Sequence, residues 1–140
     1  MPVRWLERLR AIPFMAPLPE ATLEQLARAV SEQHMKAGDE IVRQGEPGDR
    51  FYVIDSGSAE VLVDGRTGAS LGPGDYFGEI ALLRDVPRTA TVRAREDGLL
   101  LTLTHDTFVP AVSGYSPSLA SAEAVVGLRL GPARAGIVRA

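Results

Sequence analysis

The chain has 140 residues, which is enough for one domain with its own hydrophobic core and too few for two comfortable ones. It has no cysteine, which excludes disulfides, thiol catalysis and cysteine metal sites, and its formal net charge of −3 argues against a surface that binds nucleic acid. No apolar run approaches the roughly 20 residues that span a bilayer, and the start of the chain has no signal peptide, so we expect a cytoplasmic domain.

The first part of the chain, residues 1–33, is predicted to be helical. Four apolar residues lie at positions i, i+3, i+4 and i+7, which forms a stripe facing a core; these are Leu23, Leu26, Ala27 and Val30. Trp5, Leu6 and Leu9 indicate a shorter helix before this one. We therefore expect an N-terminal helical segment that packs against the rest of the domain.

Residues 34–104 are predicted to form an antiparallel β-roll. Short runs rich in β-branched and aromatic residues alternate with glycine-rich turns, at a spacing of about 8–12 residues that is typical of a sandwich or barrel. The predicted strands are Glu40–Arg43, Phe51–Ile54, Ala59–Val63, Thr89–Ala94 and Leu99–Thr104. The last of them begins with three consecutive leucines, so we expect it to be buried on both faces.

The segment 105–131 is predicted to be helical again, and residues 132–140 to form a tail without pattern. Ser116 and Pro117 suit the start of the final helix. Pro110 falls within the preceding helix, and we expect it to shorten or displace that helix. The final helix carries more apolar residues than one core-facing stripe needs, and Val125 and Leu128 are left over.

A short helical segment interrupts the β-region between residues 76 and 92. Residues 79–83 have helix-forming composition but make little more than one turn. The N-terminus of such a turn exposes unpaired N–H groups that favour an anion. Gly78 lets a ligand approach the backbone, and the guanidinium of Arg88 can pair with the same anion. This arrangement suits one phosphate.

These residues carry a resemblance to a known family. The run Phe-Gly-Glu-Ile-Ala-Leu-Leu at 77–83 and Pro-Arg-Thr-Ala-Thr-Val at 87–92 resembles the phosphate-binding cassette of the cyclic-nucleotide-binding domain family. The turns at 38–39, 44–49 and 56–57 and the strand at 51–54 also match that family. The resemblance implies a mainly β fold with flanking helices, a jelly-roll-like β-roll, a short phosphate-binding helix and C-terminal lid helices. It implies cAMP or cGMP as the ligand, and no metal, other cofactor or catalytic residue.

The resemblance also assigns roles within the cassette. Glu79 is expected to accept a hydrogen bond from the ribose 2′-hydroxyl, and Arg88 to pair with the cyclic phosphate. Backbone N–H groups around Gly78, Ile80 and Ala81 are expected to complete the phosphate cradle.

Two further features would set base recognition. Thr89 is expected to face the phosphate or the base edge, where a threonine can hydrogen-bond guanine. Val125 and Leu128 are candidates for a lid over the base. A free apolar face on this helix could alternatively pack on the roll or on a second copy of the chain.

Two other functions remain open from the sequence. A domain that keeps this fold but has lost its ligand would act as a protein-interaction module, although such domains usually lack the cassette glutamate or arginine. An enzyme is less favoured, because no nucleophile–base pair stands out, and His34 and His105 have no third ligand for a metal. The glycines at 45, 48, 57, 72 and 74 are interpreted as turn residues.

No effector domain is visible in the sequence. Its closing segment is similar to the cytosolic cyclic-nucleotide-binding tails of some bacterial major-facilitator transporters. We therefore expect a membrane transporter in the same chain as one candidate partner of the domain.

Overall fold

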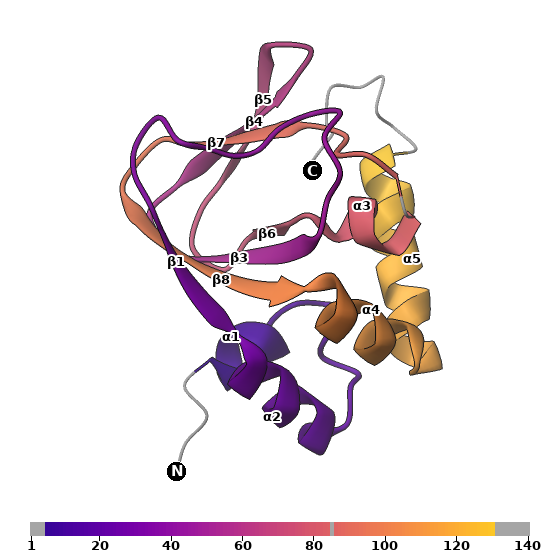
Figure 1. Ribbon diagram of the computed structural model, residues 1–140. Helices are drawn as coiled ribbons and strands as arrows, with labels where there is room; N and C mark the ends of the chain where they lie inside the picture. Colours follow the sequence, from indigo (N-terminus) through magenta and orange to yellow (C-terminus); the bar gives the residue numbers. More distant parts are fainter. Residues whose placement is uncertain (1–4, 85, 131–140) are drawn as a thin grey trace.

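The computed structural model describes residues 5–84 and 86–130, with the backbone alone for residues 116 and 128–130. In this part of the chain the strands form two four-stranded antiparallel sheets (Figure 1). The first sheet has the order β1 (Ser31–Met35), β8 (Gly98–Thr104), β3 (Arg50–Ser56) and β6 (Tyr76–Phe77). The second has the order β2 (Glu40–Val42), β7 (Thr91–Ala94), β4 (Ala59–Val63) and β5 (Arg66–Leu71).

Helices precede, interrupt and follow these strands. They are α1 (Leu6–Arg10), α2 (Glu20–Ala29), α3 (Glu79–Arg84), α4 (His105–Ser113) and α5 (Ser116–Leu130). Figure 1 shows α1, α2 and α4 on the side of the first sheet that faces away from the second sheet. None of the helices described is long and apolar enough to cross a bilayer. The expected mainly β fold with flanking helices and a short cassette helix is confirmed.

The first sheet separates two hydrophobic clusters. In β3, Phe51 and Val53 belong to the helical cluster, which lies between this sheet and the helices and includes Leu23, Phe108 and Val112. The alternate residues Tyr52 and Ile54 belong to the roll cluster, between the two sheets, which includes Val61, Phe77 and Val92. Successive side chains of a strand point to opposite faces, so β3 contributes to both clusters.

Strand β8 is built in the same way. Leu101 and Leu103 pack into the helical cluster, and Leu100 packs into the roll cluster. The leucine run predicted to be buried on both faces is therefore confirmed, because a strand covered on both sides needs apolar residues at successive positions.

The boundaries of the β-roll differ from the prediction. The helical segment was expected to reach residue 33, but α2 ends at Ala29 and β1 begins at Ser31. The sequence of β1, Ser-Glu-Gln-His-Met, is polar because most of its residues are exposed, so it gives no alternating apolar signal. Strands β5 and β6 were also missed, since β5 is largely exposed and β6 has two residues.

The expectation for Pro110 is wrong in part. Helix α4 runs through Pro110 to Ser113 and is not displaced from the end of the roll. Proline removes the N–H that would bond to the carbonyl of Asp106, but both residues are exposed, so water can satisfy that carbonyl. The carbonyl of Pro110 still accepts the backbone N–H of Gly114 at 2.9 Å.

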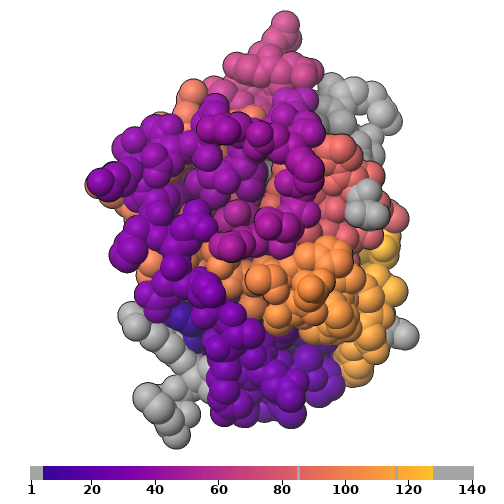
Figure 2. All heavy atoms as spheres, in the orientation of Figure 1, coloured from indigo at the N-terminus to yellow at the C-terminus, as the bar shows by residue number. Residues whose placement is uncertain are grey.

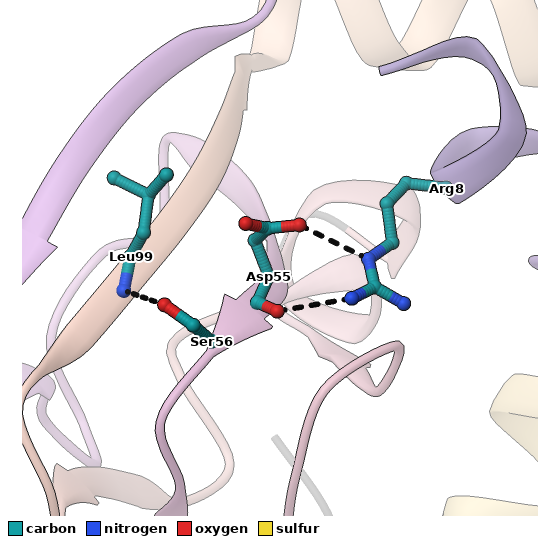
Figure 3. Close-up of polar contacts among 4 residues, drawn as sticks. All are labelled: Arg8, Asp55, Ser56 and Leu99. Carbon is teal, nitrogen blue, oxygen red and sulfur yellow. Dashed lines mark hydrogen bonds and ion pairs between the residues drawn. The ribbon is translucent and has the colours of Figure 1, made fainter. Parts of the chain in front are cut away.

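The end of β3 is fixed from two sides (Figure 3). Arg8 of α1 donates from Nε to Oδ1 of Asp55 at 3.2 Å and from Nη2 to the carbonyl of Asp55 at 3.0 Å. On the other side, the hydroxyl of Ser56 accepts the backbone N–H of Leu99 at 3.1 Å. The contacts of Arg8 connect α1 to the first sheet.

The β4–β5 hairpin projects from the surface (Figure 2). Its turn residues Asp64 and Gly65 have φ of 53° and 78°, the left-handed values that a two-residue type I′ turn requires. The side chain of Gln44 donates to the Asp64 carboxylate at 3.0 Å and accepts the Asp64 backbone N–H at 2.8 Å. The hairpin is thereby joined to the loop between β2 and β3.

Candidate functional site

The cassette is built around a tight connection between β6 and α3. Gly78 joins them with φ of +98°, a conformation that residues with a side chain rarely adopt. A Cβ at this position would lie 2.8 Å from the Arg50 carbonyl oxygen and 2.8 Å from Nη1 of Arg88. Only glycine fits here, and it allows α3 to begin directly after the strand.

Helix α3 is anchored from its buried side. Ile80 and Leu82 are fully or almost fully buried, at 0% and 3% exposure. Leu82 packs in the helical cluster, so the helix is held by the same core as α4 and α5. The first N–H groups of a helix have no partner within it, and this anchoring fixes the direction in which they point.

Arg88 is the central charged residue of the site. Its side chain is only 4% exposed. Nη1 donates to the Gly78 carbonyl at 3.1 Å and Nη2 donates to the Arg50 carbonyl at 2.8 Å. The guanidinium carbon lies 5.8 Å from the centre of the Tyr52 ring. These contacts fix the orientation of the guanidinium and use two of its five N–H donors.

Burial and charge act in opposite directions on Arg88. Burial lowers the pKa of the guanidinium, and the neighbouring Tyr52, Asp49 and Glu79 oppose that shift. Arginine stays protonated in proteins, so Arg88 remains a cation at neutral pH despite this lowering of its pKa. Burial likewise raises the pKa of the Tyr52 hydroxyl, which therefore stays neutral. The site presents a fixed positive charge in a largely dry environment.

Glu79 brings a second charge to the site. It is the first residue of α3 and is wholly buried. A carboxylate at a helix N-terminus is stabilised by the helix dipole, and here it also lies within the electrostatic reach of Arg88. A buried acceptor of this kind suits a hydroxyl donor from a ligand.

The loop 44–49 lies along the segment that carries Arg88, just before β7. The backbone N–H of Gly45 donates to the Arg88 carbonyl at 2.9 Å, and the Arg88 N–H donates to the Glu46 carbonyl at 2.8 Å. Two hollows flank this loop. One, of about 100 Å³, is lined by residues that include Asp49, Tyr52 and Arg88. The other, of about 220 Å³, is lined by Pro47, Gly48, Ala81, Val86 and Pro87.

The structure brings the predicted cassette residues together. Gly78, Glu79, Ile80 and Ala81 follow one another at the start of α3, and Arg88 reaches back to Gly78. Thr89 is half-buried directly after Arg88. The roles of these residues toward a ligand stay predictions.

The two lid candidates have different outcomes. Val125 packs against the helical cluster, so part of its apolar surface is already covered. The side chain of Leu128 lies outside the described residues. A lid over the base, and the association of two copies through α5, stay predictions.

Sequence reasoning missed the residues behind Arg88. The Arg50 carbonyl and the Tyr52 ring lie in β3, and Arg50 is 38 residues from Arg88 in the sequence. Gly48 was interpreted as a turn residue, and Gly45, Gly57 and Gly74 do have positive φ. The φ of Gly48 is not positive. A Cβ at Gly48 would lie 2.6 Å from the Arg88 guanidinium carbon. The reason for glycine at 48 is therefore close contact and not backbone conformation.

Taken together, the β-roll, the short helix and the buried arginine form a site whose chemistry suits a small anion. The family model for the cyclic nucleotide-binding domain matches residues 32–115. The chain belongs to this family.

Known proteins similar to this chain include kinase regulatory subunits. The cAMP-dependent protein kinase regulatory subunit of Yarrowia lipolytica is 42% identical over 102 residues, which cover 71% of this chain and 27% of that protein. The chain thus spans about a quarter of this curated relative.

Two solved structures similar to this chain are also regulatory parts of kinases. A mutant regulatory subunit of a cAMP-independent protein kinase A from Trypanosoma brucei, bound to cAMP in its A site, is 28% identical with a TM-score of 0.77, over 87% of this chain and 46% of that chain. The regulatory domain of Toxoplasma gondii PKA with cAMP is 33% identical with a TM-score of 0.75, over 84% and 45%.

These relatives correct one expectation. They are regulatory subunits of eukaryotic kinases, and none of the three is a bacterial protein or a transporter. These relatives therefore do not support the expected association with a bacterial membrane transporter.

Proposed function

We propose that this domain is a regulatory module that binds cAMP in the cassette 76–92 and catalyses no reaction. The observation that carries the proposal is the Arg88 guanidinium, 4% exposed and held by two backbone carbonyls beside the N-terminus of α3. A buried cation needs a partner of opposite charge, and the helix N-terminus favours the same partner.

The charges of the site support a cyclic phosphate in particular. A cyclic phosphodiester carries one negative charge, which matches one arginine. A phosphomonoester such as AMP carries close to two at neutral pH, and the buried Glu79 carboxylate would repel the additional charge. The same carboxylate can accept a ribose hydroxyl. We therefore expect cAMP to bind more tightly than AMP or adenosine.

The relatives support a regulatory role. The Yarrowia lipolytica relative is named as a regulatory subunit of a kinase, and the Toxoplasma gondii structure is a regulatory domain with cAMP. By similarity, we propose that the effector of this module is a protein kinase. Ligand binding would reach the effector through α4 and α5, which contact each other and the cassette helix.

Calorimetric titration with cAMP, AMP and adenosine tests the ligand. Arg88→Ala should weaken cAMP binding by about 2–4 kcal/mol, roughly 30- to 1000-fold, because a charge-assisted contact is lost. Arg28→Ala is the matched control, since Arg28 is exposed on α2. Unchanged cAMP affinity in Arg88→Ala would overturn the site. No binding of any of the three by the wild-type domain would favour a protein-interaction module instead.

A further inference from the structure

The contact between Gly48 and Arg88 is unusually close. An ideal Cβ built on Gly48 would lie 2.6 Å from Cζ and 2.7 Å from Nε of Arg88, and 2.8 Å from the Cβ of Ala81. Carbon atoms that are not bonded normally lie about 3.5–4.0 Å apart. The backbone of Gly48 therefore lies directly on the guanidinium, with no room for even a methyl group.

The backbone conformation at Gly48 does not itself require glycine. Its φ lies outside the left-handed region, in contrast to that of Gly45 in the same loop, which is +87°. An alanine could adopt the conformation of Gly48 without strain. Only the side chain that alanine would add conflicts with the neighbouring atoms.

Arg88 cannot move aside without losing contacts. A long side chain could usually shift its end to accommodate a methyl group. Here the guanidinium is held by the carbonyls of Gly78 and Arg50 at 3.1 and 2.8 Å, and a Cβ on Gly78 would also lie 2.8 Å from Nη1. Displacement by a group on Gly48 would break these hydrogen bonds, of which the one to Gly78 is buried and the one to Arg50 is partly buried.

We infer that Gly48 is a positioning residue: it sets how deep the Arg88 guanidinium lies and thereby the place of the bound phosphate. The loop 44–49 closes over the guanidinium from the side of Gly48 and shields it from water. A larger residue at 48 would displace Arg88 from the position in which its remaining donors meet the anion. The effect on ligand binding rests on the proposed function, whereas the steric coupling does not.

A double-mutant cycle tests the inference with four proteins: wild type, Gly48→Ala, Arg88→Ala and the double variant. The contact of residue 48 with Ala81 is present in both backgrounds and cancels, so the cycle isolates the contact with Arg88. We expect Gly48→Ala to weaken cAMP binding about tenfold when Arg88 is present, and less than about twofold when it is absent. Arg88→Lys should relieve the conflict in the Gly48→Ala background, because lysine lacks the planar guanidinium.

Thermal unfolding without ligand gives the same cycle independently of cAMP. Gly48→Ala should lower the unfolding midpoint of the wild type more than that of Arg88→Ala. The matched control is Gly72→Ala, because a Cβ at Gly72 meets no atom within 4 Å and its φ is not positive. Equal destabilisation in both backgrounds would overturn the inference, as would wild-type cAMP affinity in Gly48→Ala. If the wild type binds no cAMP but the thermal cycle shows coupling, the proposed function fails and the steric inference stands.

Discussion

Arg88 and Arg93 are close in the sequence, but their charges have different partners. Arg93 on β7 pairs with Glu60 on β4 across the second sheet, and its side chain is 40% exposed. This pair is partly buried, and its two charges offset each other within the sheet. Arg88 is buried and its guanidinium donates to backbone carbonyls, whereas the guanidinium of Arg93 donates to a carboxylate. Burial, and not residue type, distinguishes the proposed binding residue Arg88 from Arg93.

The buried Glu79 predicts discrimination at the ribose. Removing the 2′-hydroxyl takes one hydrogen bond away from a buried carboxylate, so 2′-deoxy-cAMP should bind about 1–3 kcal/mol more weakly than cAMP. In Glu79→Ala the preference should disappear. Competition binding of the two nucleotides to both proteins measures it, and equal affinities for the wild type would place the Glu79 side chain away from the ribose.

Thr89 predicts how the base is read. Its hydroxyl can bond guanine, so Thr89→Ala should weaken cGMP by about 0.5–1.5 kcal/mol and leave cAMP unchanged. Thr67→Ala on the exposed strand β5 is the control. Calorimetry with both nucleotides is sufficient, and an equal loss for both would assign Thr89 to phosphate recognition alone.

The cassette residues could be predicted from the sequence because they are close to one another along the chain. Gly78, Glu79 and Arg88 lie within one segment whose local pattern already indicates an anion site. The contacts behind Arg88 were not accessible. They come from Arg50 and Gly48 in a different part of the chain, and their closeness depends on how β3 pairs with β6 and β8.

At the scale of elements, the helices after the roll are part of the core. Ala122 and Val126 of α5 are fully buried, and the side chains of Arg84 in α3 and Glu123 in α5 form an ion pair at 2.7 Å. Removing α5 would therefore open the helical cluster, and loss of binding after truncation would not by itself identify a lid. The ion pair joins α5 directly to the cassette helix α3.

Hydrogen exchange can follow α5 without truncation. If α5 closes when ligand binds, its backbone amides should become more protected with cAMP, because the ligand favours the closed form by its difference in affinity. The binding-deficient Arg88→Ala should show no such change. Equal protection of residues 116–130 with and without cAMP in the wild type would show that this helix is not the switch.

Pro110 predicts a gain of stability on substitution. Pro110→Ala restores an N–H that can bond to the carbonyl of Asp106 within α4, and proline in a helix interior costs about 3 kcal/mol relative to alanine. The exposed position leaves room for alanine, so the unfolding midpoint should rise. Thermal denaturation measures this, and Pro117→Ala, near the start of α5, should have a smaller effect. A midpoint that stays the same or falls would show that α4 is adapted to the missing bond.

Strand prediction succeeded where burial left a pattern. Strands β3, β4 and β8 are rich in apolar residues because at least one face is covered. Strand β1 carries one buried residue and β5 one, so their pairing is determined by neighbours and not by their own composition. The expectation for Pro110 was wrong in part because the burial of Phe108 and Val112 in α4 offsets the local cost of the proline.

At the scale of the whole molecule, the first sheet lies between the helical cluster and the roll cluster and joins them into one unit. Leu100 and Leu101 are neighbours in β8 but pack into different clusters. Leu100→Ala and Leu101→Ala should each cost about 2–5 kcal/mol, and each should destabilise both clusters together. Fluorescence of Trp5, which packs against the helical cluster, and far-ultraviolet circular dichroism should report the same midpoint in both variants. A lower midpoint for circular dichroism than for Trp5 in Leu100→Ala would show that the roll melts alone.

The alternation of β3 and β8 also limits how the chain can change in length. One added or deleted residue within either strand would exchange the side chains on one side of the change between the two clusters, unless a bulge absorbed it. Tyr52, which lies beside Arg88, would then turn toward the helices, and the anion site would lose one wall. Insertions are expected to survive at the β4–β5 turn, where Asp64 and Gly65 are exposed and project from the surface. Homologous chains should therefore vary in length at this hairpin while β3 and β8 keep a constant number of residues.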